Sequence, residues 1–264
     1  MLKLHAGIDA GSVATKAVII EEDFPGTPES RPRILTKALV PTGADPVGAA
    51  EKALSQVLSQ CGLRREQLAS IGGTGYGRIR LSGVDRVITE ITCHAYGVHW
   101  LFPAARTVID VGGQDIKVIR TNELGQVEDF VMNDKCAAGT GRFLEVMANA
   151  LGMDLEQLAR VDLDGKAAPI SSTCTVFAES EVISLVASGT PTLEIIRGLF
   201  NSVAERIQGM AARLIIEPEV AMTGGVSAIR GIPQAIERHL GLQVHVPELA
   251  QFAGAFGAAL LSRK

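Results

Sequence analysis

The 264-residue sequence has no long apolar run and no concentration of basic charge. No apolar stretch approaches the roughly 20 residues that a membrane-spanning helix needs. The net charge is −4, and no cluster of lysine and arginine is interleaved with aromatic residues. Nucleic acids and anionic membranes are therefore poor candidate partners. The first residues lead into a strand-like segment without a signal-peptide pattern, so a cytoplasmic location is expected.

Cysteine is also scarce, with only four residues in the chain, at positions 61, 93, 136 and 174. Their wide, uneven spacing fits neither a zinc-binding CxxC pair nor a disulfide framework, and cytoplasmic thiols usually stay reduced. We expect Cys61 at a helix end and Cys93 in the core. For Cys136 and Cys174 two interpretations stay open: buried free thiols, or ligands of a site shared between subunits.

Cys136 and Cys174 each precede a segment with helix-start signals. A helix start carries unpaired N–H groups and partial positive charge, which stabilise thiolates and anionic clusters. Two thiolates make half of the Cys₄ set that an iron–sulfur cluster needs. A two-fold dimer would supply the other half from identical residues.

Hydrophobic residues make up 47% of the chain and charged residues 20%, so a substantial core is available and disorder is not expected. The length suffices for two lobes of ordinary size or for one large domain. No linker rich in proline and serine separates the halves, so two lobes would be closely joined.

One motif occurs twice. Ile8-Asp9-x-Gly11 and Ile109-Asp110-x-Gly112 each read as strand, glycine turn and strand, and each is followed by a lysine and β-branched residues. An aspartate that ends a strand, followed by a glycine turn, lets backbone N–H groups converge as a phosphate-binding loop requires. One such hairpin is more often a plain turn, but the repeat indicates two similarly folded lobes that face a cleft.

Capping residues, terminal glycines and apolar periodicity predict further elements. The expected helices cover residues 45–61, 90–101, 140–151, 175–188, 190–214 and 253–261. Short strands are expected at 68–72, 220–222 and 243–246. Thr140 and Thr175 are the expected caps of their helices. The glycine-rich segments 73–78 and 223–226 suit either a ligand-binding loop or simple turns.

With these residues in view, the sequence resembles the activator component of 2-hydroxyacyl-CoA dehydratases, a group that also includes ATPase subunits of benzoyl-CoA reductase. The resemblance runs from Gly7 to Ala259, and its most specific stretches are 133–143 and 171–184, followed by 109–117 and 222–226. It implies an α/β, actin/Hsp70/sugar-kinase-like (ribonuclease H-like) duplicated two-lobe fold with a nucleotide cleft between the lobes. The lobes are expected at 1–100 and 101–249, with a final helix at 250–264 that packs back on the first.

The resemblance further implies a homodimer with one [4Fe-4S] cluster, held by Cys136 and Cys174 of each subunit. Its activity would be ATP-driven delivery of single low-potential electrons to a 2-hydroxyacyl-CoA dehydratase or related CoA-ester reductase, in anaerobic metabolism. Ferredoxin or flavodoxin would reduce the cluster. Closure of the lobes on ATP is expected to change the angle between the cluster-bearing helices and with it the cluster potential.

Carried onto this sequence, the resemblance also gives the nucleotide and Mg²⁺ ligands. The expected ATP-binding residues are Asp9, Gly11, Ser12, Val13, Ala14, Thr15, Lys16, Gly112, Gly113, Gln114, Asp115, Gly224, Gly225 and Gln251. Val13 departs from the family, which more often has a hydroxyl residue there, so only its backbone N–H is available. Asp9 and Asp110 would hold Mg²⁺ through water, and Asp110 or Gln114 would orient the attacking water. Both aspartates also suit plain turn capping.

Three alternatives remain at this point. Within the family, the chain could be an ATPase subunit of benzoyl-CoA reductase or the reductase of a double-cubane iron–sulfur protein. Outside it, an actin-fold small-molecule kinase would use ATP while the cysteines only pack. A nucleotide-binding regulator without turnover is the third.

Overall fold

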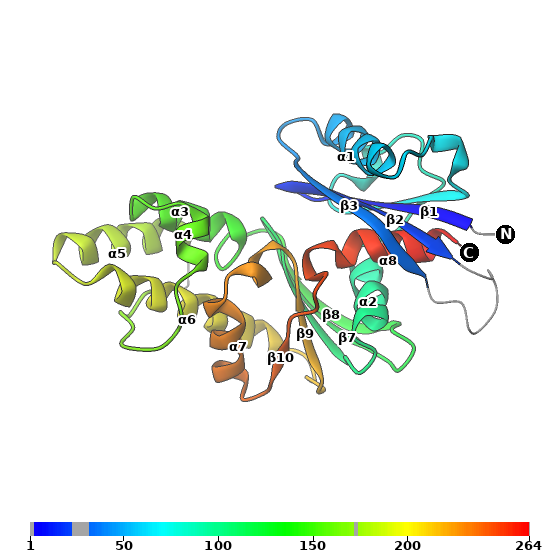
Figure 1. Cartoon of the computed structure of the whole chain (residues 1–264). Helices are drawn as coiled ribbons and strands as arrows, with labels where there is room; N and C mark the ends of the chain where they lie inside the picture. Colours follow the sequence, from blue (N-terminus) through cyan, green and yellow to red (C-terminus); the bar gives the residue numbers. More distant parts are fainter. Residues whose placement is uncertain (1–2, 23–31, 172–173, 264) are drawn as a thin grey trace. The chain divides into compact units, whose positions relative to one another are not determined.

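The computed structural model describes residues 3–22, 32–171 and 174–263. The chain divides into two compact units (Figure 1). Unit 1 comprises Met1–Pro103, Leu124–Val127 and Gln251–Lys264, and unit 2 comprises Ala104–Glu123 and Glu128–Ala250. Across the described residues, no helix combines the length and apolar character needed to cross a membrane.

Unit 1 is built on a five-stranded sheet in the order β3-β2-β1-β4-β5. Strands β1, β2 and β3 are antiparallel neighbours, whereas β4 runs parallel to β1 and to β5. Helix α1 packs on one face, and α8 packs on the other with α2 against it (Figure 1). The bounds are β1 Lys3–Ala10, β2 Ala14–Glu22, β3 Arg33–Pro41, β4 Ser70–Thr74, β5 Arg86–Val87, α1 Pro46–Cys61, α2 Glu90–Leu101 and α8 Ala253–Ser262, with short 3-10 turns η1 Arg65–Gln67, η2 Arg78–Arg80 and η4 Ala250–Phe252.

Unit 2 has a second five-stranded sheet in the order β10-β9-β6-β7-β8. Helix α6 contacts α7 and β7. Helix α3 packs against α4 and α5, and these three helices lie to one side of the sheet (Figure 1). A single apolar cluster joins strands β6, β7 and β9 to helices α3, α6 and α7. The bounds are β6 Thr107–Val111, β7 Ile116–Thr121, β8 Val127–Asn133, β9 Val220–Thr223, β10 Val244–His245, α3 Gly141–Ala150, α4 Leu155–Ala159, α5 Thr175–Ala187, α6 Thr192–Ala211, α7 Gly231–Leu240 and η3 Gly225–Ala228.

The two sheets repeat one topology. In each, a central strand turns back through an antiparallel hairpin and pairs on its other side with a later parallel strand: β1 with β2 and β4, β6 with β7 and β9. The recurring Ile-Asp-x-Gly motif occupies the same hairpin position in both. The sequence repeat is therefore a repeat of structure, as predicted.

The sequence signals for helix ends predict α1 and α2 correctly because capping depends on residues close together in the chain. Helix α1 has Asp45 as its N-cap, which accepts a hydrogen bond from the Gly48 N–H at 3.0 Å, and it ends at Gly62 with φ of 63°. Helix α2 spans Glu90–Leu101 as predicted, with Cys93 fully buried. One cap differs from the expectation: Cys174, not Thr175, is the N-cap of α5, because Cys174 has the extended backbone and Thr175 is already helical.

Small residues bring α8 very close to the first sheet. A Cβ atom added to Gly7 of β1 would lie 1.9 Å from the Ala255 carbonyl oxygen and 2.5 Å from the Ala259 nitrogen. Only glycine fits at such a distance. The alanine- and glycine-rich final helix is thus closely packed against β1.

Candidate nucleotide and cysteine sites

The hairpin of unit 1 places a carboxylate and an ammonium group opposite each other at the end of β1. Asp9 pairs in register with Lys16, and Lys16 Nζ lies 3.3 Å from Asp9 Oδ2. Asp9 is only 2% exposed, and its second oxygen, Oδ1, is buried without a hydrogen-bond partner among the described residues. A buried carboxylate oxygen left in this way is chemically suited to a cation or a cation-bound water.

The turn between β1 and β2 contains the other residues predicted to face phosphate in unit 1. Gly11 and Ser12 are half-buried, and Val13 is exposed at the tip. Thr15 is fully buried, and its hydroxyl lies 2.9 Å from that of Thr42, which itself donates to the Gly11 carbonyl at 2.8 Å. The Thr15 hydroxyl therefore braces the turn, which leaves backbone N–H groups, Ser12 and Lys16 as the groups nearest to a ligand at the tip.

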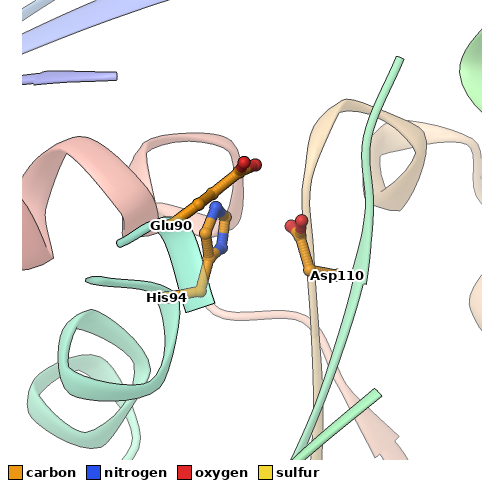
Figure 2. A group of neighbouring side chains, drawn as sticks. All are labelled: Glu90, His94 and Asp110. Atoms are coloured by element: carbon orange, nitrogen blue, oxygen red, sulfur yellow. The ribbon is translucent and has the colours of Figure 1, made fainter. Parts of the chain in front are cut away.

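The hairpin of unit 2 repeats this arrangement with a denser charge cluster. Asp110 projects from β6 (Figure 2) and faces Lys117 across the hairpin. Lys117 Nζ lies 3.2 Å from Asp110 Oδ2 and 2.8 Å from Asp115 Oδ2. The other oxygen of Asp110, Oδ1, accepts a hydrogen bond from the Thr223 hydroxyl at 2.9 Å. Both oxygens of Asp110 are thus held by the protein, while Gln114 is exposed in the turn.

Gly224 stands immediately beside this cluster. Its φ is 87°, and a Cβ atom there would lie 2.2 Å from the Val111 carbonyl oxygen and 3.0 Å from Asp110 Oδ1. Gly224 therefore lets the backbone after β9 approach the end of β6. Its N–H donates to the carbonyl of Ala250 at 3.2 Å, the residue before the half-buried Gln251, and Gly225 beside it is exposed.

Cys136 and Cys174 are both half-buried thiols of unit 2, in segments whose helices, α3 and α5, pack against each other. Cys174 is the N-cap of α5, where the helix N–H groups point outward. The carbonyl of Cys136 accepts a hydrogen bond from the Asn133 side chain at 2.8 Å. Ser172 and Thr173, which belong to the predicted cysteine motif, lie outside the described residues.

Backbone hydrogen bonds connect the second hairpin to the helix that follows Cys136. The N–H of Gly141 donates to the Gly112 carbonyl at 3.0 Å, and the N–H of Arg142 donates to the Gly113 carbonyl at 2.9 Å. These are the first N–H groups of α3, which have no partner within the helix. The glycine turn therefore caps α3 directly.

The model of the BadF/BadG/BcrA/BcrD ATPase family matches residues 6–262, almost the full length of the chain. The chain belongs to the BadF/BadG/BcrA/BcrD ATPase family. The predicted resemblance is thus confirmed, and both hairpins and both cysteine segments lie within the matched residues.

Individual relatives of this ATPase family are similar over nearly their whole length. The (R)-2-hydroxyglutaryl-CoA dehydratase activating ATPase of Acidaminococcus fermentans is 45% identical, with 98% of this chain and 96% of that protein covered. The activator of lactoyl-CoA dehydratase of Anaerotignum propionicum is 46% identical, with coverage of 96% and 95%.

Solved structures are similar to this chain over nearly its whole length. The activator of the 2-hydroxyisocaproyl-CoA dehydratase from Clostridium difficile, solved with bound ADPNP, superposes with a TM-score of 0.89 at 39% identity, covering 100% of this chain and 94% of that one. A glucokinase of the ROK family from Streptomyces griseus has a TM-score of 0.58 at 18% identity, covering 98% and 99%, which shows the fold alone. The predicted actin- and sugar-kinase-like α/β fold is confirmed.

Several residues around these hairpins were not singled out from the sequence of this ATPase. Lys117 and Thr223 hold Asp110, and Glu90 and His94 lie one turn apart on α2 with their side chains next to each other (Figure 2). The i, i+4 spacing of Glu90 and His94 on an expected helix was the available signal.

Proposed function

We propose that this chain is an ATP-hydrolysing activator that delivers single low-potential electrons to a 2-hydroxyacyl-CoA dehydratase or a related CoA-ester reductase. Relatives at 45% and 46% identity carry the names of dehydratase activators. The observation that carries the proposal for this chain is the hydrogen bonding of Gly112 and Gly113 to the first turn of α3. It joins the nucleotide hairpin to the segment that contains Cys136.

The nucleotide would be held by backbone N–H groups and charged side chains of the two hairpins. In unit 1 these are the turn 11–13 and Lys16, and in unit 2 the turn 112–115. The buried, unpartnered Oδ1 of Asp9 supports its assignment to Mg²⁺ through water. The backbone next to Gly224 and Gly225, with Gln251, is assigned to the adenosine.

The thiols of Cys136 and Cys174 fit half of a [4Fe-4S] ligand set, because both are half-buried and neither forms a disulfide. A cluster bound there would supply a one-electron redox centre. The protein contributes the positive N-terminus of α5 beside Cys174, which stabilises negative charge on the sulfur. Asn133 fixes the backbone at Cys136.

A second copy of the chain would complete the ligand set and form a homodimer. Helix α5, which begins at Cys174, exposes a series of large apolar side chains that a monomer would leave in water. They are Val176 at 66%, Phe177 at 66%, Ile183 at 55% and Val186 at 48% exposure. Apolar and aromatic residues are what the centre of a dimer interface typically buries.

Coupling would pass from the nucleotide to the cysteines through α3. A shift of the 112–113 turn on nucleotide binding moves the carbonyls that cap α3, and the helix must follow or lose two hydrogen bonds. Movement of α3 alters the exposure and hydrogen bonding of the sulfur at Cys136, which tune cluster potential. For one electron, a change of a few kcal/mol corresponds to roughly 100–200 mV.

Ferredoxin or flavodoxin is the proposed electron donor. A cytoplasmic location accompanies this function, since thiolate ligands must stay reduced. The benzoyl-CoA reductase ATPase and double-cubane reductase alternatives differ only in the acceptor enzyme.

The deciding experiment is anaerobic purification followed by iron and sulfide analysis, dimer mass, and ATP-dependent activation of a purified 2-hydroxyacyl-CoA dehydratase. We expect about four irons per dimer, a brown colour that dithionite bleaches, and dehydratase activity that requires ATP. A colourless protein that phosphorylates a small molecule would establish the kinase alternative. Nucleotide binding without turnover in the reduced protein would establish a regulator.

A further inference from the structure

Hydrolysis of ATP requires a group that orients the attacking water, and the contacts of Asp110 leave it poorly placed for this task. Its Oδ2 faces Lys117 at 3.2 Å and its Oδ1 accepts from Thr223 at 2.9 Å. These contacts suit Asp110 to anchoring the hairpin. In unit 1, the Oδ2 of Asp9 faces Lys16. A third carboxylate, that of Glu90, stands in the first turn of α2, in the same unit as Asp9.

The start of α2 is fixed beside Asp9 by the strand ends of unit 1. Asp9 pairs in register with Thr74 of the parallel strand β4. The Thr74 hydroxyl donates to the carbonyl of Ile88 at 2.9 Å, and the Ile88 N–H donates to the carbonyl of Gly73 at 2.8 Å. Glu90 follows two residues later in the first turn of α2, so the half-buried Glu90 carboxylate belongs to the same strand-end region as the first hairpin.

His94 connects Glu90 to Asp9 from one helical turn further along. His94 is 3% exposed, and one of its ring nitrogens lies within 4.8 Å of a Glu90 carboxylate oxygen (Figure 2). A Cβ atom added to Gly254 would lie 2.8 Å from His94 Nε2 and 3.3 Å from Asp9 Oδ2. The imidazole and the Asp9 carboxylate therefore converge on the same glycine.

The buried thiol of Cys93 is affected by the charges of both Asp9 and Glu90. Burial is the main cause that raises the pKa of Cys93 to about 12, a hydrogen bond with Thr74 acts in the opposite direction, and the negative charges of Asp9 and Glu90 raise the pKa further. Both carboxylates thus act on one thiol.

We infer that Glu90 is the catalytic residue that orients the attacking water in ATP hydrolysis, and that His94 is its positioning residue. This inference rests on the proposed ATPase function. The water oxygen forms a bond to the γ-phosphorus while the bond from that phosphorus to the β–γ bridging oxygen breaks and ADP leaves. The water proton passes to the Glu90 carboxylate and from there to solvent, so that ADP, inorganic phosphate and one proton result.

The test compares Glu90→Gln with Glu66→Gln, an exposed glutamate of the same unit, in the full-length, cluster-loaded protein. We expect Glu90→Gln to lower kcat for ATP by about 10²–10⁴-fold. Its affinity for ADP, measured by calorimetry, and its iron content should stay within about threefold of wild type. Glu66→Gln should change neither. A kcat for Glu90→Gln close to that of wild type, or an equal loss of ADP affinity, would overturn the role of Glu90.

A further variant separates positioning from folding. His94→Gln should lower kcat with little change in KM. Unchanged kcat in a folded His94→Gln protein would remove His94 from the assignment. Should wild type bind ADP but hydrolyse no ATP, the proposed function itself fails. If wild type hydrolyses ATP and Glu90→Gln hydrolyses it equally fast, the role of Glu90 is refuted and the proposed ATPase function stands.

Discussion

Lys117 Nζ lies 3.2 Å from Asp110 Oδ2, directly across the β6–β7 hairpin. Lys16 and Asp9 repeat the pair in unit 1 at 3.3 Å. The two ion pairs differ in how far the lysine is exposed to solvent: the side chain of Lys117 is 1% exposed and that of Lys16 is 14% exposed. Lys117 also bridges to Asp115, so we expect a structural role for Lys117 and a phosphate-binding role for Lys16.

Replacement of Lys117 should therefore be costly to stability. Lys117→Met leaves two carboxylates without their cation, one of them buried, and the expected loss is about 3–5 kcal/mol in the free energy of unfolding. Urea unfolding followed by circular dichroism measures it. Lys135→Met is the control, since Lys135 is 86% exposed in its pair with Asp134 and should shift stability by less than about 1 kcal/mol. Equal midpoints for the two variants would contradict this reading.

Cysteine replacements should distinguish the two proposed cluster ligands from Cys61. Cys136→Ala and Cys174→Ala should each lose iron and the visible absorption of the anaerobic protein, because a cluster needs its thiolate ligands. Cys61→Ala, at the end of α1, should keep both. Iron analysis with parallel circular dichroism distinguishes ligand loss from unfolding. Full iron content in Cys136→Ala would refute the ligand assignment.

The contact between β1 and α8 should tolerate no side chain at position 7. Gly7→Ala places a Cβ atom 1.9 Å from the Ala255 carbonyl oxygen, and we expect a loss of about 3 kcal/mol or more through forced movement of the helix. Gly209→Ala is the matched control on the exposed face of α6, where nothing lies within 4 Å of the added atom. It should stabilise by about 0.5–1 kcal/mol. Thermal unfolding would show opposite shifts, and a neutral Gly7→Ala would disprove this close contact.

His5 should make stability depend on pH. Burial lowers the pKa of His5 below 6.5, the positive charges of Arg263 and Lys3 act in the same direction, and Glu22 opposes them. The unfolded chain takes up a proton near pH 6.5 that the folded chain binds only at lower pH. Stability therefore rises with pH below about 6.5 and falls on acidification.

The measurement for His5 is the urea midpoint between about pH 5 and 7.5. His5→Gln should remove part of the slope, even though it also loses the hydrogen bond between His5 Nδ1 and the Ser70 hydroxyl at 2.7 Å. His239→Gln, at a half-buried position near the end of α7, serves as the control variant. Parallel pH profiles for wild type and His5→Gln would show that His5 does not contribute.

Elements with local signals could be predicted from the sequence. Helix α1 follows from Asp45, Pro46 and Gly62, and the two hairpins follow from their repeated motif. Strands β3 and β8 and helix α7 were not predicted. Strand β3 runs along the edge of its sheet beside β2. It buries Ala38 and Val40 but exposes Leu39 between them, so its sequence does not alternate apolar and polar residues.

The sequence alone determined the family, the repeated fold and the positions of the two thiol segments, because caps, glycine turns and long motifs act over a few residues. Only the tertiary structure decided which groups meet. Thr223 reaches Asp110 across 113 positions of the chain. Gly254 stands between His94 and Asp9, and the 112–113 turn caps α3. Such contacts depend on how strands and helices pack, and no local preference of the chain encodes that packing.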